Sequence, residues 1–377
     1  MKLLYVSSAS IPTTKAHGLT IAKSCEALAK CGVEVILTIP SRKKIFDTDL
    51  FDTYAIERVF KTQTLYSLDI LSLNDGRAFF ILQLLSFYVS LFWHMLFQKR
   101  SNTVVYTREP HLIFLALLGF RVVYECHHIF NTKSFFFWLC RRSYKIITIS
   151  KALKEAFLNQ GFKDENIIIA PSGVDLDTFE ISITQNEART KLGLLPEGSL
   201  IVYTGNFTTM GQDKGIADII RSLKHIPKVT FLAVGGSKPD QVYYRNLTIE
   251  YGVDDRVFLH GNTSQRNLAL YQRAADILLM PFPDTPHYRN HMSPVKMFEY
   301  MASGVPIIAS DLPTIREVLN ERNSIIVPPG DSSAIAKAVT LLLSDQMYGI
   351  TLASQAKEDV TQYSWQNRTQ RILSHIL

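Results

Sequence analysis

The sequence predicts an α/β fold in which two doubly wound halves face each other across a cleft. Short apolar segments typical of buried strands alternate with helical segments, and this alternation runs through the chain twice. A strand, helix and strand at this spacing imply a right-handed crossover and a parallel sheet. A polar stretch, residues 177–187, separates the two runs. We therefore expect ligands at the carboxyl ends of the strands, where such folds bind them.

In the first half, apolar runs bounded by polar or glycine residues mark the strands. Strands are expected at Lys2–Ser7, Val33–Ile39, Thr103–Tyr106, Val122–Tyr124, Lys145–Ile149 and Ile167–Ala170. Apolar residues that recur at helical spacing mark the helices between them. Helices are expected at Leu19–Cys31, His111–Leu118 and Lys151–Asn159. Residues 8–18 read as a long loop before the first helix.

The second half repeats the pattern. Strands are expected at Leu200–Tyr203, Lys228–Val234, Arg256–Leu259, Ile277–Met280 and Ile325–Val327, and helices at Ile216–Leu223 and Tyr363–Ile376. We expect residues 1–176 to form the first Rossmann-like domain and residues 177–360 the second. Residues 361–377 are expected to form a C-terminal helix, anchored by Trp365, that packs back on the first domain.

Composition limits the classes of partner. The chain has 377 residues, of which 47% are hydrophobic and 20% charged, which is typical of a globular protein of two domains. Its four cysteines show no metal-ligand or C-x-x-C spacing, so we expect a reduced, cytoplasmic protein without disulfides. The formal charge is +5 in residues 1–180 and +1 in residues 181–377. No basic run is interleaved with aromatic residues, so nucleic acid is not an expected partner.

One segment, Ala78–Gln98, is a candidate for contact with a membrane. It is apolar and nearly long enough to span a bilayer. Gln83, Ser86, Ser90 and His94 form a polar stripe at helical spacing. We expect a helix that is buried on most of its sides. A helix resting on a membrane surface is the second interpretation, and a transmembrane helix the third.

The clearest candidate for a binding site is the stretch from Ser293 to Asp311. Ser293 is a good N-cap, Pro294 suits the first helical position, and Gly304 suits the end of the helix. The start of such a helix binds anions, and Lys296 adds a full charge there. Glu299 lies one turn further on and is suited to accept hydroxyls from a ribose attached to a phosphate. The alternative is an ordinary capped helix that packs its apolar side into a core.

Three other groups of residues lie where ligands are expected. The loop from Thr204 to Gly215 follows a strand and ends with Lys214, which suits a diphosphate; a flexible loop with a solvated lysine is the alternative. Arg289 and His291 precede the candidate helix and are placed to reach the same phosphates; exposed loop residues are the alternative. Residues Asp284–Asn290 lack apolar periodicity, which predicts a mobile loop. His127 and His128 end a strand, and a structural role is their alternative.

Several common enzyme motifs are absent from the sequence. Neither half carries G-x-G-x-x-G after its first strand, and G-x-x-x-x-G-K-[ST] is absent, which argues against a dinucleotide oxidoreductase and a P-loop enzyme. No G-x-S-x-G elbow occurs either.

Taken together, these segments resemble the family 4 retaining glycosyltransferases of the GT-B fold, and the resemblance covers nearly the whole chain. The matching segments occur in the family's order: P-T-T-K-A-H-G-L-T-I-A-K (12–23), E-A-L-A-K-C-G-V-E-V (26–35), V-V-Y-E-C-H-H (122–128), P-S-G-V-D-L-D-T-F (171–179), T-G-N-F (204–207), D-K-G (213–215) and S-P-V-K-M-F-E-Y-M-A-S-G-V-P-I-I-A-S-D (293–311).

The resemblance assigns roles to the candidate residues. In the second half, Glu299 would hold the ribose, and Lys214 with the N–H groups of Val295 and Lys296 would hold the diphosphate of a sugar nucleotide. Ser293, Pro294, Gly205 and Asn206 would also line this donor site. In the first half, Gly18 would let the first loop approach the phosphates, and His127 would touch the transferred sugar or its departing oxygen. The family needs no metal or other cofactor, and a front-face mechanism is commonly proposed for it.

The sequence departs from the family pattern at two positions. His291 stands where a sugar-contacting glutamate is usual, and Asn206-Phe207 stand where an arginine is usual. Our hypothesis is that Arg289 supplies the missing charge. The expected acceptor is a glycan or a lipid-linked molecule used in cell-surface polysaccharide or glycoconjugate synthesis, which makes a membrane surface a candidate partner and a peripheral position on the inner face of the membrane a candidate location.

Two other functions remain open at the level of sequence. One is a sugar-nucleotide epimerase of similar shape, for which Glu109 and Glu125 are the candidate acid/base carboxylates. The other is a protein that binds nucleotide sugars without turnover, which the changes at His291 and Asn206 make conceivable.

Overall fold

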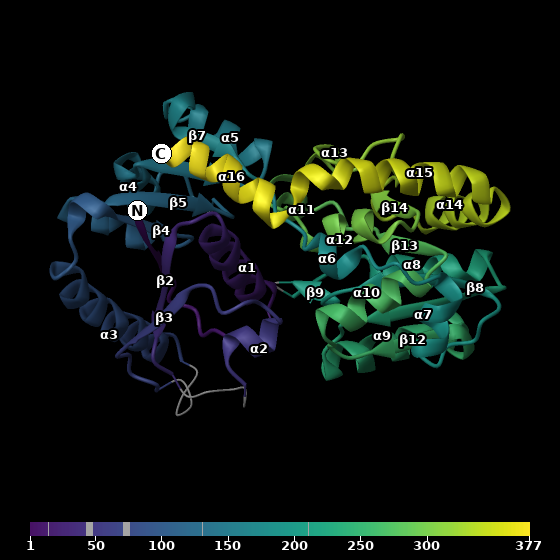
Figure 1. Ribbon diagram of the computed structural model, residues 1–377. Helices are drawn as coiled ribbons and strands as arrows, with labels where there is room; N and C mark the ends of the chain where they lie inside the picture. Colours follow the sequence, from purple (N-terminus) through teal and green to yellow (C-terminus); the bar gives the residue numbers. More distant parts are fainter. Residues whose placement is uncertain (14, 43–47, 71–75, 130, 210) are drawn as a thin grey trace. The chain divides into compact units, whose positions relative to one another are not determined.

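Two parallel sheets organise the chain, and each belongs to its own unit (Figure 1). The computed structural model describes every residue except 14, 43–47, 71–75, 130 and 210. Unit 1 comprises Met1–Pro171 together with Trp365–Leu377, and unit 2 comprises Ser172–Ser364. Unit 1 is therefore discontinuous in sequence, because its last segment follows the whole of unit 2.

The sheet of unit 1 has seven parallel strands in the order β3-β2-β1-β4-β5-β6-β7. The strands are β1 (Lys2–Val6), β2 (Glu34–Pro40), β3 (Lys61–Leu65), β4 (Thr103–Thr107), β5 (Arg121–Cys126), β6 (Lys145–Thr148) and β7 (Ile167–Ile169). In β1, Leu4 lies beside Ile36 of β2 on one side and Val105 of β4 on the other. Strands covered on both faces are nearly continuous apolar runs, as Leu3 to Val6 are.

The helices of unit 1 cover both faces of this sheet. They are α1 (Ala16–Lys30), α2 (Leu50–Tyr54), α3 (Arg77–Leu96), α4 (Phe135–Leu139), α5 (Lys151–Leu158) and α16 (Trp365–Ile376), with 3₁₀ helices η1 (Arg100–Asn102), η2 (Pro110–Leu118), η3 (Cys140–Arg142) and η4 (Asp164–Asn166). Leu3 and Tyr5 join one core cluster with α1 and α16, whereas Leu4 and Val6 join the other with α3 and η2. This alternation follows from the two-residue period of a strand.

The sheet of unit 2 has six parallel strands in the order β12-β11-β8-β13-β14-β15. They are β8 (Ser199–Thr204), β11 (Val229–Val234), β12 (Val257–His260), β13 (Ile277–Met280), β14 (Ile307–Ser310) and β15 (Ile325–Val327), and a small hairpin of β9 (Thr208–Thr209) and β10 (Gln212–Asp213) follows β8. The order reverses at β8, so β11 and β13 flank it and the loops after all three strands share one edge.

The helices of unit 2 also lie on both faces of its sheet. They are α6 (Leu176–Phe179), α7 (Gln185–Lys191), α8 (Ile216–Ser222), α9 (Lys238–Tyr251), α10 (Gln265–Ala274), α11 (Pro286–Asn290), α12 (Val295–Ser303), α13 (Pro313–Arg316), α14 (Ser332–Ser344) and α15 (Gln346–Asp359), with 3₁₀ helices η5 (Leu223–His225), η6 (Asp254–Arg256) and η7 (Val360–Tyr363).

The α/β class and the parallel sheets agree with the expectation from the sequence, but several local predictions are wrong. The first helix begins at Ala16 and not at Leu19, so Gly18 lies in its first turn. Residues 111–118 form a 3₁₀ helix. The segment expected to be a mobile loop contains α11, which is capped by the Thr285 hydroxyl. Thr14 and Met210, in two of the predicted loops, lie outside the described residues.

The prediction of a mostly buried helix at residues 78–98 is also wrong. Only Gln83, Phe87, Leu91 and Met95 of α3 are buried. The helix packs against the unit along this narrow stripe, because Phe87, Leu91 and Met95 enter the core beneath the sheet. By length and composition α3 is the one helix, among the described residues, that is able to cross a membrane.

Candidate functional site

Three loops meet at the carboxyl edge of the unit 2 sheet. Gly205 directly follows β8 and has a φ of 106°, which favours glycine. A Cβ atom at Gly205 would lie 3.3 Å from Cε of Lys296, so the missing side chain leaves room for that lysine. At Gly215 a Cβ atom would lie 1.9 Å from the carbonyl oxygen of Pro281, which follows β13. The loops are therefore packed backbone to backbone around the start of α12.

The helix α12 begins at Val295, with Pro294 as the N-cap residue and no side-chain cap. The prediction that Ser293 caps this helix is wrong. Its Oγ atom accepts a hydrogen bond from the backbone N–H of Ser172, at 2.8 Å, and its carbonyl accepts one from the Ser172 hydroxyl, at 2.7 Å. Because the Ser293 hydroxyl is bound to Ser172 and does not cap α12, the first N–H groups of the helix remain available to a ligand.

Lys296 is a buried cation in the first turn of α12. The residue is only 8% exposed, and its Nζ atom has no hydrogen-bond partner among the described residues. The ammonium group lies 3.4 Å from the centroid of the Tyr203 ring and 5.6 Å from that of Phe282. Burial and the nearby charge of Lys214 hold the pKa of Lys296 well below its usual range, against the opposing effect of Glu299.

Lys214 supplies a second cation to the same place. It follows the β9-β10 hairpin, and its N–H donates to the carbonyl of Phe207 at 3.1 Å. Burial lowers the pKa of Lys214 to about 8, although Asp240 acts in the opposite direction. Asp213, the preceding residue, accepts hydrogen bonds from the N–H groups of Gly215 and Ile216 at 2.8 and 3.2 Å and so fixes the start of α8.

Glu299 lies one turn beyond Lys296 and is also buried. Burial raises the pKa of Glu299 to about 7, and Lys296 and Gln272 only partly offset this effect. The side-chain amide of Gln272, on α10, donates to Oγ1 of Thr204 at 3.0 Å and approaches Oε2 of Glu299 at 3.5 Å. The carboxylate therefore faces the end of β8 with most of its capacity to accept hydrogen bonds unused.

One of the two departures from the family pattern, at Asn206 and Phe207, has a structural explanation. Phe207 is a fully buried core residue that packs edge-on against Tyr203 and Tyr244, and Asn206 accepts a hydrogen bond from the Tyr203 hydroxyl through its backbone carbonyl. Neither residue offers a charge. Arg289 is exposed and forms an ion pair with Asp284, with Nε 2.9 Å from Oδ1. Its assignment to a diphosphate thus stays a prediction.

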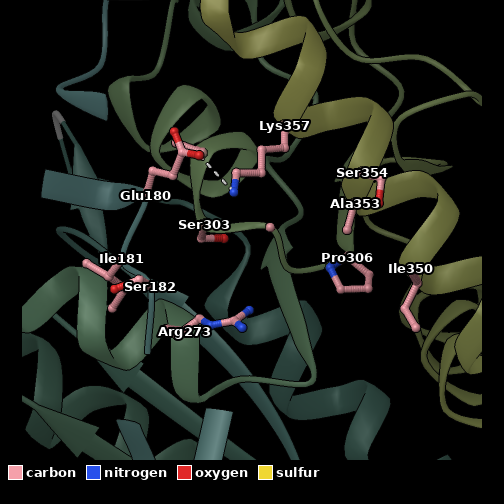
Figure 2. A pocket seen from close by; sticks show the side chains of 12 residues that line it. Glu180, Ile181, Ser182, Arg273, Ser303, Pro306, Ile350, Ala353, Ser354 and Lys357 are labelled. Atoms are coloured by element: carbon pink, nitrogen blue, oxygen red, sulfur yellow. Dashed lines mark ion pairs between the residues drawn. The ribbon is translucent and has the colours of Figure 1, made fainter. Parts of the chain in front are cut away.

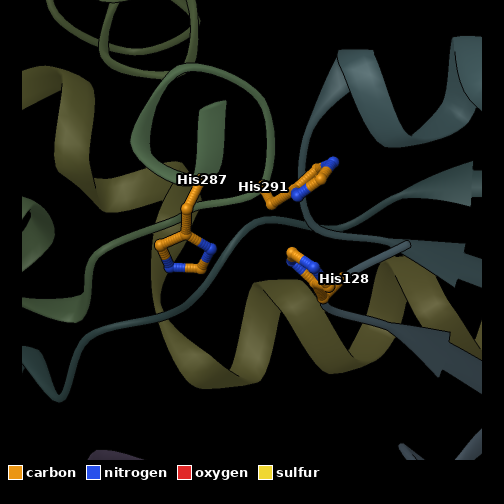
Figure 3. Close-up of side chains that lie close together, drawn as sticks. All are labelled: His128, His287 and His291. Carbon is orange, nitrogen blue, oxygen red and sulfur yellow. The ribbon is translucent and has the colours of Figure 1, made fainter. Parts of the chain in front are cut away.

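Two histidines lie one turn apart beside the start of α12. His287 is in α11 and His291 ends that helix, with its N–H donating to the carbonyl of His287 at 2.9 Å. Figure 3 shows both rings, whose centroids are 6.4 Å apart. His128, also labelled in Figure 3, follows β5 in unit 1. A histidine at position 291 offers a hydrogen bond to a hydroxyl but carries no carboxylate charge.

His127 belongs to a separate charged cluster in unit 1. Its Nε2 atom lies 2.6 Å from Oε1 of Glu125, which is fully buried on β5. Arg108 and Arg368 approach the same carboxylate at 2.9 and 3.0 Å, and the Tyr106 hydroxyl donates to it. Burial acts to raise the pKa of Glu125, but the two arginines and His127 hold it well below its usual range. Glu125 is therefore an ionised anchor that fixes the orientation of His127.

The pKa of His127 itself is lowered. Burial is the main cause, the positive charge of Arg108 adds to it, and Glu125 opposes both. The imidazole is therefore neutral near neutral pH, with Nε2 directed at Glu125 and the other ring nitrogen left for a ligand. Arg368 comes from α16 and also donates from Nε to the carbonyl of Pro171 at 2.7 Å.

Gly18 has a structural role within unit 1. A Cβ atom there would lie 2.2 Å from the hydroxyl oxygen of Tyr54 and 2.5 Å from Cγ2 of Thr13. The Tyr54 hydroxyl accepts from the N–H of Thr13 at 2.7 Å, which holds the preceding loop close to α1. The proposed approach of this loop to phosphates stays a prediction.

A hollow of about 340 Å³ lies at the opposite, C-terminal end of α12 (Figure 2). Its lining includes Ser303, Gly304, Arg273 and an ion pair in which Lys357 Nζ lies 2.9 Å from Oε1 of Glu180. It is separate from the cations at the helix start and belongs to another part of unit 2.

The structure thus brings Gly205, Lys214, Val295, Lys296 and Glu299 together at one edge of unit 2, and places His127 and Gly18 in unit 1. The sequence did not point to Tyr203 and Gln272, which contact Lys296 and Glu299, or to the arginines around Glu125. An aromatic residue at the carboxyl end of a predicted strand was a usable signal for Tyr203. Gln272 and Arg368 had no such signal in the sequence, because their contacts join distant parts of the chain.

Comparison with known families gives two consecutive matches. The family described as "Glycosyltransferase Family 4" matches residues 20–178, and the family described as "Glycosyl transferases group 1" matches residues 198–345. Together the two regions cover most of the chain, and their junction lies close to the boundary between the units.

Similar proteins agree with these matches. A D-inositol 3-phosphate glycosyltransferase of Xylanimonas cellulosilytica is 29% identical over 53% of this chain and 48% of its own. A putative teichuronic acid biosynthesis glycosyltransferase, TuaC of Bacillus subtilis, is 24% identical over 57% and 51%. The matched region spans about half the length of these relatives. The solved structure of HepE from Anabaena, in complex with UDP and glucose, shares 18% identity over 99% of this chain and 98% of that chain with a TM-score of 0.75. This likeness shows the GT-B fold.

Proposed function

Because the chain belongs to the family 4 glycosyltransferases, we propose that it is a retaining transferase that moves a sugar from a nucleotide-sugar donor to a glycan or lipid-linked acceptor. The observation that carries this proposal is the buried ammonium group of Lys296, which has no hydrogen-bond partner among the described residues. An unpaired buried cation is costly and is expected where an anionic ligand completes the site.

A nucleoside diphosphate fits the groups around Lys296. The free N–H groups at the start of α12 and the Lys214 and Lys296 ammonium groups suit the diphosphate. Glu299, one turn away, suits the two hydroxyls of the ribose. Gly205 has no side chain, which leaves room for Lys296 and also lets a ligand approach the backbone closely.

The same groups account for catalysis. As the bond between the sugar and the diphosphate breaks, negative charge grows on the departing oxygen, and the two lysines and the helix start stabilise it. These cations supply the positive charge that a metal supplies in other transferases, so we propose that turnover needs no metal. The neutral imidazole of His127, held by Glu125, is assigned to the transferred sugar. We name no nucleophile, in keeping with the front-face mechanism that the family resemblance implies.

The relatives suggest which substrates to try first. HepE was solved with UDP and glucose, so a uridine diphosphate sugar is our first choice of donor. The relatives named for inositol phosphate and teichuronic acid lead us to propose an acceptor used in cell-surface polysaccharide or glycoconjugate synthesis at the cytoplasmic face of a membrane.

The alternative of an epimerase has no support in the side-chain contacts. Its candidate acid/base groups are both engaged: Glu125 is held ionised by two arginines, and Glu109 accepts from His111 at 3.0 Å and from the Ser7 hydroxyl at 3.1 Å. A carboxylate fixed in this way is a poor proton carrier.

The experiment is a thermal-shift screen of UDP-, GDP- and ADP-sugars, followed by turnover assays with radiolabelled donor. A ligand that binds only the folded protein raises its melting temperature. We expect one class of donor to stabilise the wild-type protein, Lys296→Met to abolish that shift, and free sugar or glycosylated acceptor to form in the presence of EDTA. Failure of all three nucleotides to stabilise the protein contradicts the proposal. Binding without any turnover supports the third function considered, a nucleotide-sugar-binding protein.

A further inference from the structure

The helix α3 presents an apolar face to the outside of unit 1. Its exposed fractions include 52% for Leu85, 59% for Val89 and 59% for Trp93, and the residue after the helix, Phe97, is 84% exposed. The other exposed apolar residues of the helix are Phe80, Ile81, Leu82, Phe92 and Leu96. The sequence from Ala78 to Gln98 contains no Asp, Glu, Lys or Arg. A helix that faces water normally carries charged residues on such a face.

The polar residues of α3 point into the unit instead. Gln83 is buried, and its Oε1 accepts from the N–H of Ile70 at 3.1 Å. The Oγ of Ser86 accepts from the N–H of Leu68 at 2.8 Å. His94 lies 3.0 Å from the Gln98 amide. The polar residues of α3 thus accept hydrogen bonds from the backbone of the neighbouring segment at Leu68 and Ile70, and the apolar residues face outward. This is the reverse of the pattern expected for a helix in water.

The apolar surface continues from α3 to α4. The Tyr88 ring on α3 lies 5.1 Å from that of His111 on η2, which in turn lies 6.1 Å from that of Phe136 on α4. On α4, Phe135 is 64% exposed and Trp138 is 48% exposed. We call this surface, formed by the exposed apolar residues of α3 and α4 with Phe97 and Leu117, the apolar face. Of the three tryptophans of the chain, the two exposed ones, Trp93 and Trp138, both belong to it.

Basic side chains flank the residues of the apolar face in the sequence, and the guanidinium of Arg142 lies 6.0 Å from the centroid of the Trp138 ring. Residues 77–142 contain eight Lys or Arg and two Asp or Glu. The exposed basic residues are Arg77, Lys99, Arg100, Arg121, Lys133, Arg141 and Arg142. Of the two acidic residues, Glu109 is hydrogen-bonded by His111 and Ser7, and Glu125 is paired with two arginines, as described above. Among the described residues of this stretch, the exposed charges are therefore all positive.

We propose that the apolar face docks unit 1 on the surface of a bilayer that contains anionic lipid, with α3 lying in the plane of the interface. Exposed tryptophans and apolar residues with a basic border match the two layers of such a surface, acyl chains below and phosphate head groups above. The helix lies on the bilayer and does not cross it, because Phe87, Leu91 and Met95 are part of the core of unit 1. A protein partner would not require this uniform positive charge.

The first experiment measures co-sedimentation of the full chain with vesicles, without donor or acceptor, so its outcome is independent of the proposed transfer activity. Vesicles of phosphatidylcholine alone are compared with vesicles that also contain phosphatidylglycerol. We expect binding to the anionic vesicles, weaker binding at high salt, and a loss of about fivefold in affinity for each of Lys99→Gln and Arg100→Gln. Leu85→Glu with Val89→Glu should abolish binding.

The matched control is Val242→Glu with Tyr243→Glu, two residues on α9 of unit 2 that are 63% and 62% exposed. It introduces the same charge on another exposed apolar pair and should bind vesicles like the wild type. Equal loss of binding in the control variant overturns the proposal, because it shows that net charge alone decides binding.

A second measurement requires no variant. Quenching of tryptophan fluorescence by brominated lipid reports contact with acyl chains, and Trp365 is too buried to contribute strongly. We expect quenching in anionic vesicles. Absence of quenching overturns the proposal, as does a wild-type dimer that Leu85→Glu with Val89→Glu converts to a monomer and that vesicles do not dissociate, since a second copy of the chain would then cover the apolar face.

Discussion

The ammonium group of Lys296 lies 3.4 Å from the centre of the Tyr203 ring, and no described atom accepts a hydrogen bond from it. The electron-rich face of the ring attracts the cation but satisfies none of its three donors. The lysine is therefore held in position before any ligand arrives, and an anion that binds at the start of α12 supplies the partners that the protein does not.

Replacing Lys296 with methionine should stabilise the unliganded protein while it weakens donor binding. Methionine fills a similar volume without a buried, unpaired charge, so we expect the free energy of unfolding to rise by about 1–2 kcal/mol. Loss of a charge-assisted contact should weaken nucleotide-sugar affinity by about tenfold or more. Urea denaturation and titration calorimetry measure the two effects.

A matched control for this substitution is Lys224→Met. Lys224 also lies over an aromatic ring, that of Tyr251 at 4.5 Å, but its side chain is exposed. We expect neither stability nor affinity to change. A destabilised Lys296→Met protein would show that the lysine contributes to the fold and not to a ligand site.

Donor affinity should depend on pH with a maximum between about 7 and 8. Glu299 accepts ribose hydroxyls in its ionised form, and its pKa is raised to about 7, so affinity falls as the pH drops through that value. Lys214 and Lys296 bind phosphate when charged, and burial lowers the pKa of both, that of Lys214 to about 8, so affinity falls as the pH rises and the lysines lose their charge. Calorimetry with a nucleotide sugar, whose diphosphate does not titrate in this range, should show both limbs. Glu299→Gln should lose only the acidic limb; a flat wild-type profile contradicts these assignments.

Removal of Arg368 should destabilise unit 1 strongly. Arg368→Met leaves the buried carboxylate of Glu125 with one arginine, and breaking one side of a buried ion pair costs about 3–5 kcal/mol. Chemical denaturation measures this loss. Arg371→Met, on the same helix but partly exposed, should change the free energy of unfolding by less than about 0.5 kcal/mol. Similar losses in both variants would indicate that α16 matters only through its helical content.

Arg289 forms an exposed ion pair with Asp284 just before the start of α12. If it leaves Asp284 for the diphosphate, Arg289→Ala should weaken donor affinity by about tenfold, and Asp284→Asn should strengthen it, because the guanidinium is then released. Unchanged affinity in Arg289→Ala would show that the ion pair with Asp284 is its whole function.

The sequence was a good guide where a signal is local. The helix Val295–Ser303 and its end at Gly304, which has a φ of 68°, were both predictable from the proline before the helix and the glycine after it. The cap was not, because the Ser293 hydroxyl is used by Ser172, which is 121 residues away. The edge strand β3 was missed because its sequence, K-T-Q-T-L, alternates too weakly to stand out from a polar loop.

Burial was the least predictable property. A long apolar helix such as α3 is expected both in a protein core and against lipid, so its sequence does not distinguish the two. Only the tertiary structure shows that Gln83 is buried and Trp93 exposed. The charged cluster around Glu125 was similarly hidden, because Arg108 and Arg368 are separated by most of the chain.

The late position of α16 in the sequence has a consequence for how the protein is made. On the ribosome, residues 1–171 and the whole of unit 2 are synthesised before Arg368 appears. Until then Glu125 lacks one of its two arginines, so the pocket that orients His127 remains incomplete. A chain interrupted during translation, or trimmed by a protease before Trp365, would carry an intact unit 2 and a defective unit 1. The order of synthesis therefore delays completion of the pocket around His127 until α16 has been made.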